Sequence, residues 1–153
     1  KSLSLALYQP DIPQNTGNLM RTAACMGVAL DIIEPCGFVL SDKGMRRAGM
    51  DYGELATLRR HNSWEKFREF HRESRIVLLS TKADVTLDQF TFQLGDVLLL
   101  GRESAGVPDD VHEEVACRVR LPMAEGARSM NVSNAGAIAA FEALRQLQAL
   151  PGE

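Results

Sequence analysis

The stretch VLLLGRESAGVP at residues 97–108 indicates the fold class. Its first four residues are all apolar, which is typical of a strand buried on both faces of a parallel sheet. Two glycines follow, and Pro108 with the acids Asp109 and Asp110 then favours the start of a short helix. A buried strand, a glycine-containing loop and a helix in this order predict one unit of an α/β fold.

The same alternation continues on both sides of this stretch. Short apolar runs predict strands at residues 3–8, 29–33, 76–80 and 118–121. Helical patterns cover residues 16–26, 63–71 and 131–150, with a shorter one at 41–48. Asn15 or Thr16 is expected to cap the first helix and Gly27 to end it. We therefore predict an α/β fold with a mostly parallel sheet flanked by helices.

Length and composition narrow the class of protein. A chain of 153 residues predicts a single domain over residues 1–153, with no appended RNA-binding domain. No apolar run approaches the ~18 residues of a membrane span, and no signal peptide is expected. Three cysteines without a CxxC pair predict a reduced, cytoplasmic setting. Neither they nor His61, His71 and His112 have the spacing of metal ligands, so no metal is expected.

Charge is unevenly distributed along the chain. The formal net charge is −3, yet residues 43–75 hold nine Lys or Arg and five Asp or Glu, a local charge of +4. A basic region on an acidic body is consistent with contact to a phosphate backbone. The same charges are also consistent with a solvated helix face, because several of them lie at ion-pairing spacing.

The last predicted helix contains the wholly apolar segment AGAIAAF at residues 135–141. A helix that is apolar all round must be buried all round. A terminal helix in a chain of this length needs cover beyond its own sheet, so we infer that a partner subunit supplies it. The alternative is a helix enclosed within the monomer.

Three segments carry more polar or glycine residues than local structure requires. NTGNLMR at residues 15–21 places Asn18 and Arg21 on one helix face, where they could bind an anion or merely cap and pair. GRESAGVP at 101–108 brings Glu103 to the end of a buried strand. RSMNVSNAG at 128–136 has more Ser and Asn than one helix cap needs. Ligands of such sheets bind at the carboxyl ends of strands, which indicates the loops after Ser80, Leu100 and Leu121.

The three segments together, in this order, resemble the three motifs of the SpoU family of RNA 2'-O-methyltransferases, within the SPOUT superfamily. The match extends over nearly the whole chain, from Tyr8 to about Leu147. The segment DKGMRRAGMDY at 42–52 is similar to the small stand-alone subgroup. Those enzymes methylate the wobble nucleotide of tRNA, position 34, which is cytidine or a modified uridine.

This resemblance implies a fold and partners that spacing alone does not. The family threads its C-terminal segment into a trefoil knot, which general topology rules would exclude. It also implies a homodimer, binding to the anticodon loop of tRNA, and S-adenosylmethionine as methyl donor with no metal, S-adenosylhomocysteine being the product.

The resemblance also implies roles for individual residues. It implies that the catalytic arginine is Arg21, supported by Asn15, Ser129 and Asn131. The cofactor-binding residues that it implies are Leu79, Gly101, Glu103, Leu121, Met123 and Ser129. Lys43, Arg46 and Arg47 are the expected RNA contacts in the basic region.

The family's usual account makes the arginine a general base, but a guanidinium keeps its proton up to about pH 12. Our hypothesis is that Arg21 anchors a phosphate and stabilises the developing alkoxide. Three alternatives stay open at this point. They are methylation at another tRNA or ribosomal RNA position, a non-catalytic RNA-binding module on the same fold, and a flavin or nucleotide binder with no RNA role.

Overall fold

The computed structural model describes residues 2–40 and 57–152. Seven parallel strands form one sheet in the order β3-β2-β1-β6-β4-β7-β5. Their bounds are β1 Leu3–Tyr8, β2 Ala29–Ile33, β3 Thr57–His61, β4 Ile76–Leu79, β5 Val85–Thr86, β6 Asp96–Leu100 and β7 Cys117–Arg120. The predicted α/β class with a parallel sheet is confirmed.

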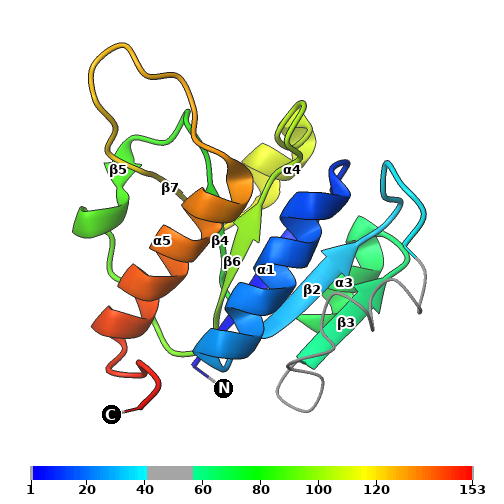
Figure 1. Ribbon diagram of the computed structural model, residues 1–153, viewed down its shortest axis with the longest axis horizontal. Coiled ribbons are helices and arrows are strands. Elements are labelled where there is room, and N and C mark those ends of the chain that lie inside the picture. Colours follow the sequence, from blue (N-terminus) through cyan, green and yellow to red (C-terminus); the bar gives the residue numbers. More distant parts are fainter. Residues whose placement is uncertain (1, 41–56, 153) are drawn as a thin grey trace.

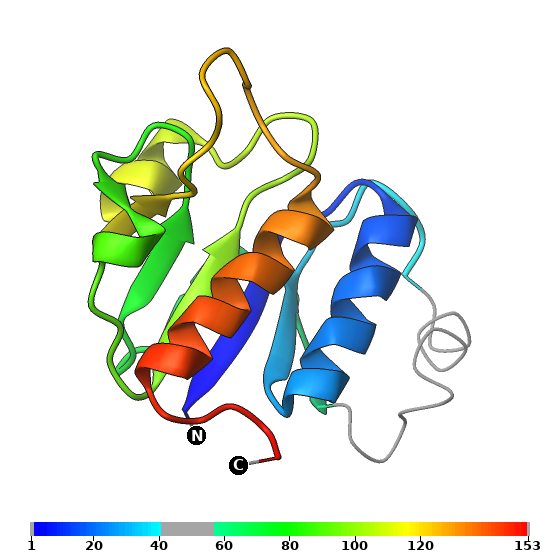
Figure 2. The same ribbon diagram turned by 60° about the vertical axis from the view of Figure 1, so that its left-hand side comes forward.

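Helices cover both faces of the sheet (Figures 1 and 2). On one face α1 (Pro13–Met26) lies beside α5 (Val132–Gln146), and the other face carries α3 (Trp64–Phe70) and α4 (Asp109–Glu114). A 3-10 turn, η1 (Leu87–Gln89), follows β5. The interior strand β1 shows how the two layers arise, because alternate side chains of a strand point to opposite faces. Leu5 packs in the core under α1 and α5, whereas Ala6 packs in the core under α3 and α4.

Close packing of α5 on the sheet depends on a glycine. A Cβ atom at Gly136 would lie 2.7 Å from Leu100 Cδ1 and 2.8 Å from Leu19 Cδ2. Both leucines are fully buried, so they have little room to move away. Gly136 therefore lets α5 approach β6 and α1, which positions the beginning of α5 above the carboxyl end of β6.

Several element boundaries differ from the sequence-based expectation. Helix α1 begins at Pro13 rather than residue 16, and no side chain caps it. Pro108 precedes α4 as its N-cap, and α5 ends at Gln146 rather than residue 150. Strand β3 was not expected, because TLRRH is polar and only its position beside β2 makes it a strand. The helix expected at 41–48 lies outside the described residues.

A buried ionic cluster ties β2 to β3 and to the end of α3. The Asp31 carboxylate is fully buried and pairs with Arg59 at 2.7 Å. Its two oxygens also contact the Nε2 atoms of His61 at 2.7 Å and His71 at 3.0 Å. Burial acts to raise the pKa of Asp31, but the hydrogen bonds from His71, Arg59 and His61 outweigh it and leave the pKa well below the ordinary value.

The same three residues Asp31, His61 and His71 form a group whose ligand atoms could surround a cation. Sequence spacing did not indicate this group, since the fold alone brings the histidines together. Arg59 already donates to both oxygens of the carboxylate, at 2.7 and 3.0 Å. The cluster is therefore satisfied as a structural network that fixes the edge of the sheet.

Candidate cofactor and RNA site

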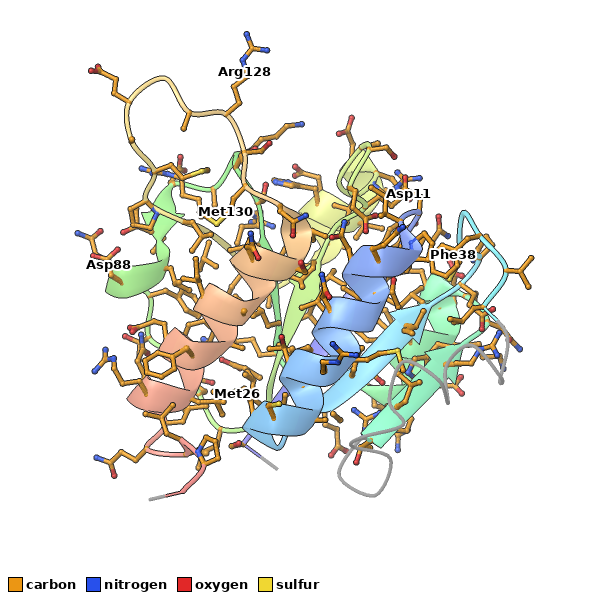
Figure 3. The ribbon with its side chains drawn as sticks, viewed as in Figure 1. Asp11, Met26, Phe38, Asp88, Arg128 and Met130 are labelled. Atoms are coloured by element: carbon orange, nitrogen blue, oxygen red, sulfur yellow. The ribbon has the colours of Figure 1, made fainter. Side chains whose placement is uncertain are left out.

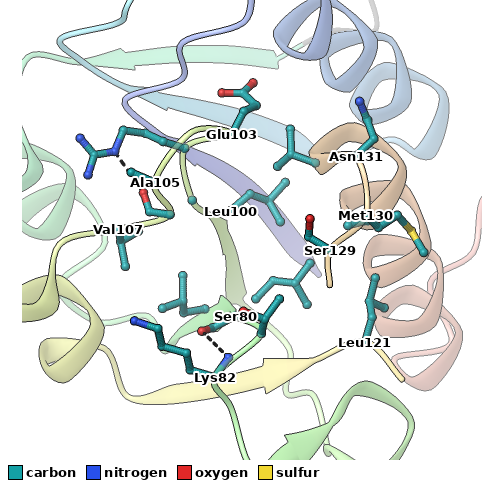
Figure 4. A pocket seen from close by; sticks show the side chains of 18 of the residues that line it. Ser80, Lys82, Leu100, Glu103, Ala105, Val107, Leu121, Ser129, Met130 and Asn131 are labelled. Carbon is teal, nitrogen blue, oxygen red and sulfur yellow. Dashed lines mark hydrogen bonds between the residues drawn. The ribbon is translucent and has the colours of Figure 1, made fainter. Parts of the chain in front are cut away.

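A pocket of about 520 Å³ opens at the carboxyl ends of β4, β6 and β7 (Figure 4). This volume lies within the range of roughly 300–1,000 Å³ that is usual for small-molecule sites. Its walls come from the three loops that sheet geometry indicated, after Ser80, Leu100 and Leu121. The location of the pocket therefore confirms the rule that ligands of parallel sheets bind at the carboxyl edge.

The inner wall of the pocket is apolar. It is formed by aliphatic side chains at the strand ends and the start of α5: Leu78, Leu79, Leu100, Leu121, Val132 and Ala135. Such a surface suits a flat heteroaromatic ring.

One side of the pocket is a tight glycine-containing turn. The backbone N–H groups of Arg102 and Gly106 each donate to the other residue's carbonyl at 2.9 Å. A Cβ atom at Gly101 would lie 2.8 Å from the backbone of Gly106, so a larger residue there would open the turn. Gly106 itself adopts a φ of 63°, which a side chain disfavours.

A chain of side-chain hydrogen bonds connects the three polar segments at the mouth of the pocket. The Asn131 amide donates to the Asn15 oxygen at 3.0 Å, and the Asn15 amide donates to Glu103 Oε2 at 3.2 Å. The Asn131 oxygen in turn accepts from the Ser133 and Asn134 backbone N–H groups and so caps α5. Asn15, at the centre of this chain, is only 6% exposed.

The Glu103 carboxylate is also bound to the segment before α1. Its Oε1 atom accepts from the Asp11 backbone N–H at 3.0 Å, and the Ser104 hydroxyl donates to the Asp11 carboxylate. Burial raises the pKa of Glu103, and contact with the Asp11 carboxyl raises it further. The contact with Glu103 and the Ser104 hydroxyl lower the pKa of Asp11. The more buried acid is thus the one that holds a proton more readily.

A family model described as the SpoU rRNA Methylase family matches residues 2–141. The chain belongs to the SpoU methylase family. It is 53% identical over 147 residues to the tRNA (cytidine(34)-2'-O)-methyltransferase of Ancylobacter novellus, covering 95% of this chain and 93% of that protein. The enzyme of the same name from Escherichia coli strain K12 is 41% identical over 147 residues, covering 95% and 94%.

Solved structures of methyltransferases are also similar to this chain. One of them is described by the words "structural insights into the 2-OH methylation of C/U34 on tRNA". It is 43% identical to this chain with a TM-score of 0.88, and the match covers 95% of this chain and 96% of that one. An AdoMet-bound rRNA methyltransferase from Sinorhizobium meliloti is 27% identical with a TM-score of 0.83, covering 95% and 57%. The trefoil knot and the single-domain organisation stay predictions.

The SpoU fold gathers most of the residues that the sequence indicated. Eight of them line the pocket: Asn15, Leu79, Gly101, Glu103, Leu121, Met123, Ser129 and Asn131. Arg21 does not line it and is exposed on α1. The RNA contacts expected at Lys43, Arg46 and Arg47 lie outside the described residues.

The SpoU pocket also contains polar residues that the sequence analysis missed. Lys82 and His112 line it, and the Ser80 hydroxyl lies 3.3 Å from His112 Nε2. The loop after Ser80 was indicated as a binding loop, but no motif distinguished its individual side chains. His112 lies on α4, which packs against β4 and β6 on the face of the sheet opposite α1 and α5. Only this packing brings His112 to the pocket.

Proposed function

We propose that this SpoU protein transfers a methyl group from S-adenosylmethionine to the ribose 2'-hydroxyl of the wobble nucleotide of tRNA. The observation that carries the proposal is the pocket with its Glu103–Asn15–Asn131 chain, in a protein 41–53% identical to enzymes named for this reaction. No helix of the described residues is both long and apolar enough to cross a membrane. We further propose that the protein acts in the cytoplasm.

The residues of the pocket fit an adenosine with a charged amino-acid tail. The apolar wall suits the adenine ring, and the turn at Gly101 lets the backbone approach it closely. Leu79, Leu121 and Met123 would hold the adenosine by shape, and Ser129 is an exposed residue of the same lining. S-adenosylmethionine supplies a methyl group on a sulfonium, so the protein's task is to align the acceptor oxygen and assist loss of its proton.

The mouth of the pocket would position the ribose. The Ser129 hydroxyl has no hydrogen-bond partner in the part of the chain that the structure describes, so it is available to the 2'-hydroxyl. Asn131 is fixed by its bond to Asn15 and by its cap of α5, which keeps the neighbouring backbone rigid. Arg128 extends from the tip of the same loop, away from the body of the protein, where an RNA strand could meet it (Figure 3).

A homodimer is part of the proposal. Ile138 and Phe141 on α5 are 46% and 51% exposed, so the helix that the sequence predicts to be buried all round is not covered by its own chain. Arg21 is exposed on the neighbouring helix α1. A second copy on this face would bury the two apolar side chains and place Arg21 at the pocket of the partner, where its fixed charge would stabilise the alkoxide.

Labelled S-adenosylmethionine and total tRNA test the reaction directly. After incubation, the tRNA is digested and the methylated nucleotide located, with an Arg21→Ala variant run in parallel. We expect label on the wobble ribose and at least a hundredfold loss in the variant. Label on another tRNA nucleotide or on ribosomal RNA would favour the alternative target. No label with intact cofactor binding would favour the RNA-binding module.

A further inference from the structure

The charged side chains of the pocket lie at opposite sides. Glu103 is beside Asn15 and Asn131 at the mouth, whereas Lys82 lies across the pocket, on the loop after β4 (Figure 4). Arg102, the other strong cation of the lining, is engaged elsewhere, since its Nε donates to the Gly106 carbonyl at 3.1 Å. Its guanidinium also lies 5.5 Å from the centre of the Tyr8 ring.

Lys82 has no such partner. Over residues 2–40 and 57–152, the structure shows no hydrogen bond or ion pair of its ammonium group. Asp84 is two residues away and forms no ion pair with it. A cation that lines a pocket and is not neutralised by the protein is a ready site for an anionic group of a ligand.

The loop that carries Lys82 is held at both ends. The Ser80 backbone N–H donates to the Val119 carbonyl at 2.8 Å, and Arg120 Nε donates to the Ala83 carbonyl at 3.0 Å. Between them, the Lys82 backbone N–H donates to the Ser80 hydroxyl at 3.1 Å. The backbone of Lys82 is therefore fixed at the rim of the pocket, so that only its side chain must order on binding a ligand.

We infer that Lys82 binds the α-carboxylate of the cofactor's amino-acid tail and thereby orients the cofactor in the pocket. This inference rests on the proposed function. S-adenosylmethionine is a cation at sulfur and carries a carboxylate at the end of its tail. With Lys82 and Glu103 on opposite walls, one orientation pairs the carboxylate with Lys82 and turns the sulfonium toward Glu103 and the reacting end.

The cofactor carboxylate explains the position of Lys82 better than an RNA phosphate does. The ribose must enter beside Asn15 and Asn131, where the polar chain lies, and Lys82 is on the opposite wall. Lys82 is therefore a binding residue that orients the cofactor, and it takes no part in proton transfer.

The test compares two probes that differ by one group. S-adenosylhomocysteine carries the carboxylate, and S-adenosyl-3-thiopropylamine is the same molecule without it. Their dissociation constants are measured by calorimetry with the full chain and with Lys82→Met, which removes the ammonium group and keeps an unbranched apolar side chain out to Cε. Lys82→Arg is the charge-preserving variant, and Lys66→Met removes an exposed lysine on α3 as the matched control.

We expect Lys82→Met to weaken S-adenosylhomocysteine binding by roughly 5-fold, a magnitude typical of one partly exposed charged hydrogen bond. Binding of the decarboxylated probe should change by less than about 2-fold, with Lys82→Arg restoring most of the loss and Lys66→Met causing none. Unchanged S-adenosylhomocysteine binding, or an equal loss for both probes, would overturn the inference. So would a loss of tRNA binding alone, which would assign Lys82 to a phosphate.

These outcomes are separate from those of the proposed function. If the unmodified protein methylates no RNA while Lys82→Met still discriminates between the two probes, the proposed reaction fails and the carboxylate site stands. If methylation of tRNA is found and the two probes lose affinity equally, the reaction stands and the inference about Lys82 fails.

Discussion

The side-chain amide of Asn131 donates a 3.0 Å hydrogen bond to the side-chain oxygen of Asn15, a residue 116 positions earlier in the chain. This bond joins the beginning of α5 to the first turn of α1. Asn15 continues the connection to Glu103 on the loop after β6. Three segments that are far apart in sequence thus share one hydrogen-bonded chain at the mouth of the pocket.

Substitution of Asn15 tests this chain. Asn15→Ala removes the acceptor of the Asn131 amide and the donor to Glu103 Oε2, so each of these groups loses its partner in the chain, while Glu103 Oε1 keeps its bond from the Asp11 backbone N–H. We expect a loss of about 1–3 kcal/mol in the free energy of unfolding, measured in urea, and a fall of at least tenfold in methyl transfer. Gln14→Ala, at an exposed position on the same helix that has no proposed role in the site, is the control and should change neither. An Asn15→Ala variant with unaltered activity would show that the chain is not needed.

Gly101→Ala tests the tight turn beside the pocket. The added methyl group would lie 2.8 Å from the Gly106 backbone, which cannot rotate away as a side chain can. We expect the turn to open and S-adenosylhomocysteine to bind at least tenfold more weakly by calorimetry. Gly152→Ala places a methyl group in open space at the end of the chain and should leave this affinity unchanged. Equal affinities of the Gly101→Ala variant and the unmodified protein would contradict the role of the turn.

The buried Asp31 carboxylate should make the free energy of unfolding depend on pH in the acid range. Hydrogen bonds from His71, Arg59 and His61 overcome the effect of burial and depress its pKa in the folded state. Its contribution to stability is therefore complete above the unfolded pKa, near 4, and is lost as the pH falls through the depressed folded value. We expect the free energy of unfolding to fall steadily below about pH 4.

Asp31→Asn should remove part of this dependence. The variant should lose about 3 kcal/mol at neutral pH, since it leaves buried partners uncompensated, and its stability should then fall less steeply in acid. Glu34→Gln, in a more exposed pair with Arg60, should cost less than about 1 kcal/mol. If the free energies of unfolding of the unmodified protein and of Asp31→Asn fell equally steeply with decreasing pH, other carboxylates would govern the acid transition.

Charged substitutions on the exposed face of α5 should change the oligomeric state of the protein. A double Ile138→Glu and Phe141→Glu variant places two charges where a second copy is proposed to pack. We expect the mass measured by light scattering to fall from dimer to monomer, with methyl transfer lost and S-adenosylhomocysteine binding reduced far less. Leu94→Glu, at a side chain that is 73% exposed elsewhere on the surface, should stay dimeric. An undisturbed mass in the double variant would exclude this face as the interface.

Arg21→Lys separates electrostatic stabilisation from general-base catalysis. If Arg21 acts through a fixed charge, the variant should lose rate by tenfold or more at every pH and keep the shape of the pH–rate profile. A new ionisation near pH 10 that restores activity would instead indicate that the side chain at this position acts as the base. The measurement is the single-turnover rate of methyl transfer to tRNA from about pH 6 to about pH 11, a range that extends past the ordinary pKa of lysine.

The sequence by itself determined the fold class and the edge of the sheet that carries the pocket. Alternating apolar runs predicted strands that match β1 and β2, and the run before Gly101 predicted the buried strand β6. These signals are local, because the burial of a strand shows directly in which of its side chains are apolar. The motif resemblance added which residues of the pocket to examine, and eight of them line it.

Tertiary structure alone decided which side chains meet. Asn15, a plausible helix cap by sequence, lies inside α1 and bonds instead to residues from two distant loops. His61 and His71 appear isolated in the sequence, yet both reach Asp31 because β3 and α3 pack beside β2. Lys82 is held at the pocket by bonds between its loop and β7, whereas Arg21 is exposed on α1 and does not line the pocket. Contacts of this kind depend on the order of strands and the packing of helices across the sheet, which no local pattern encodes.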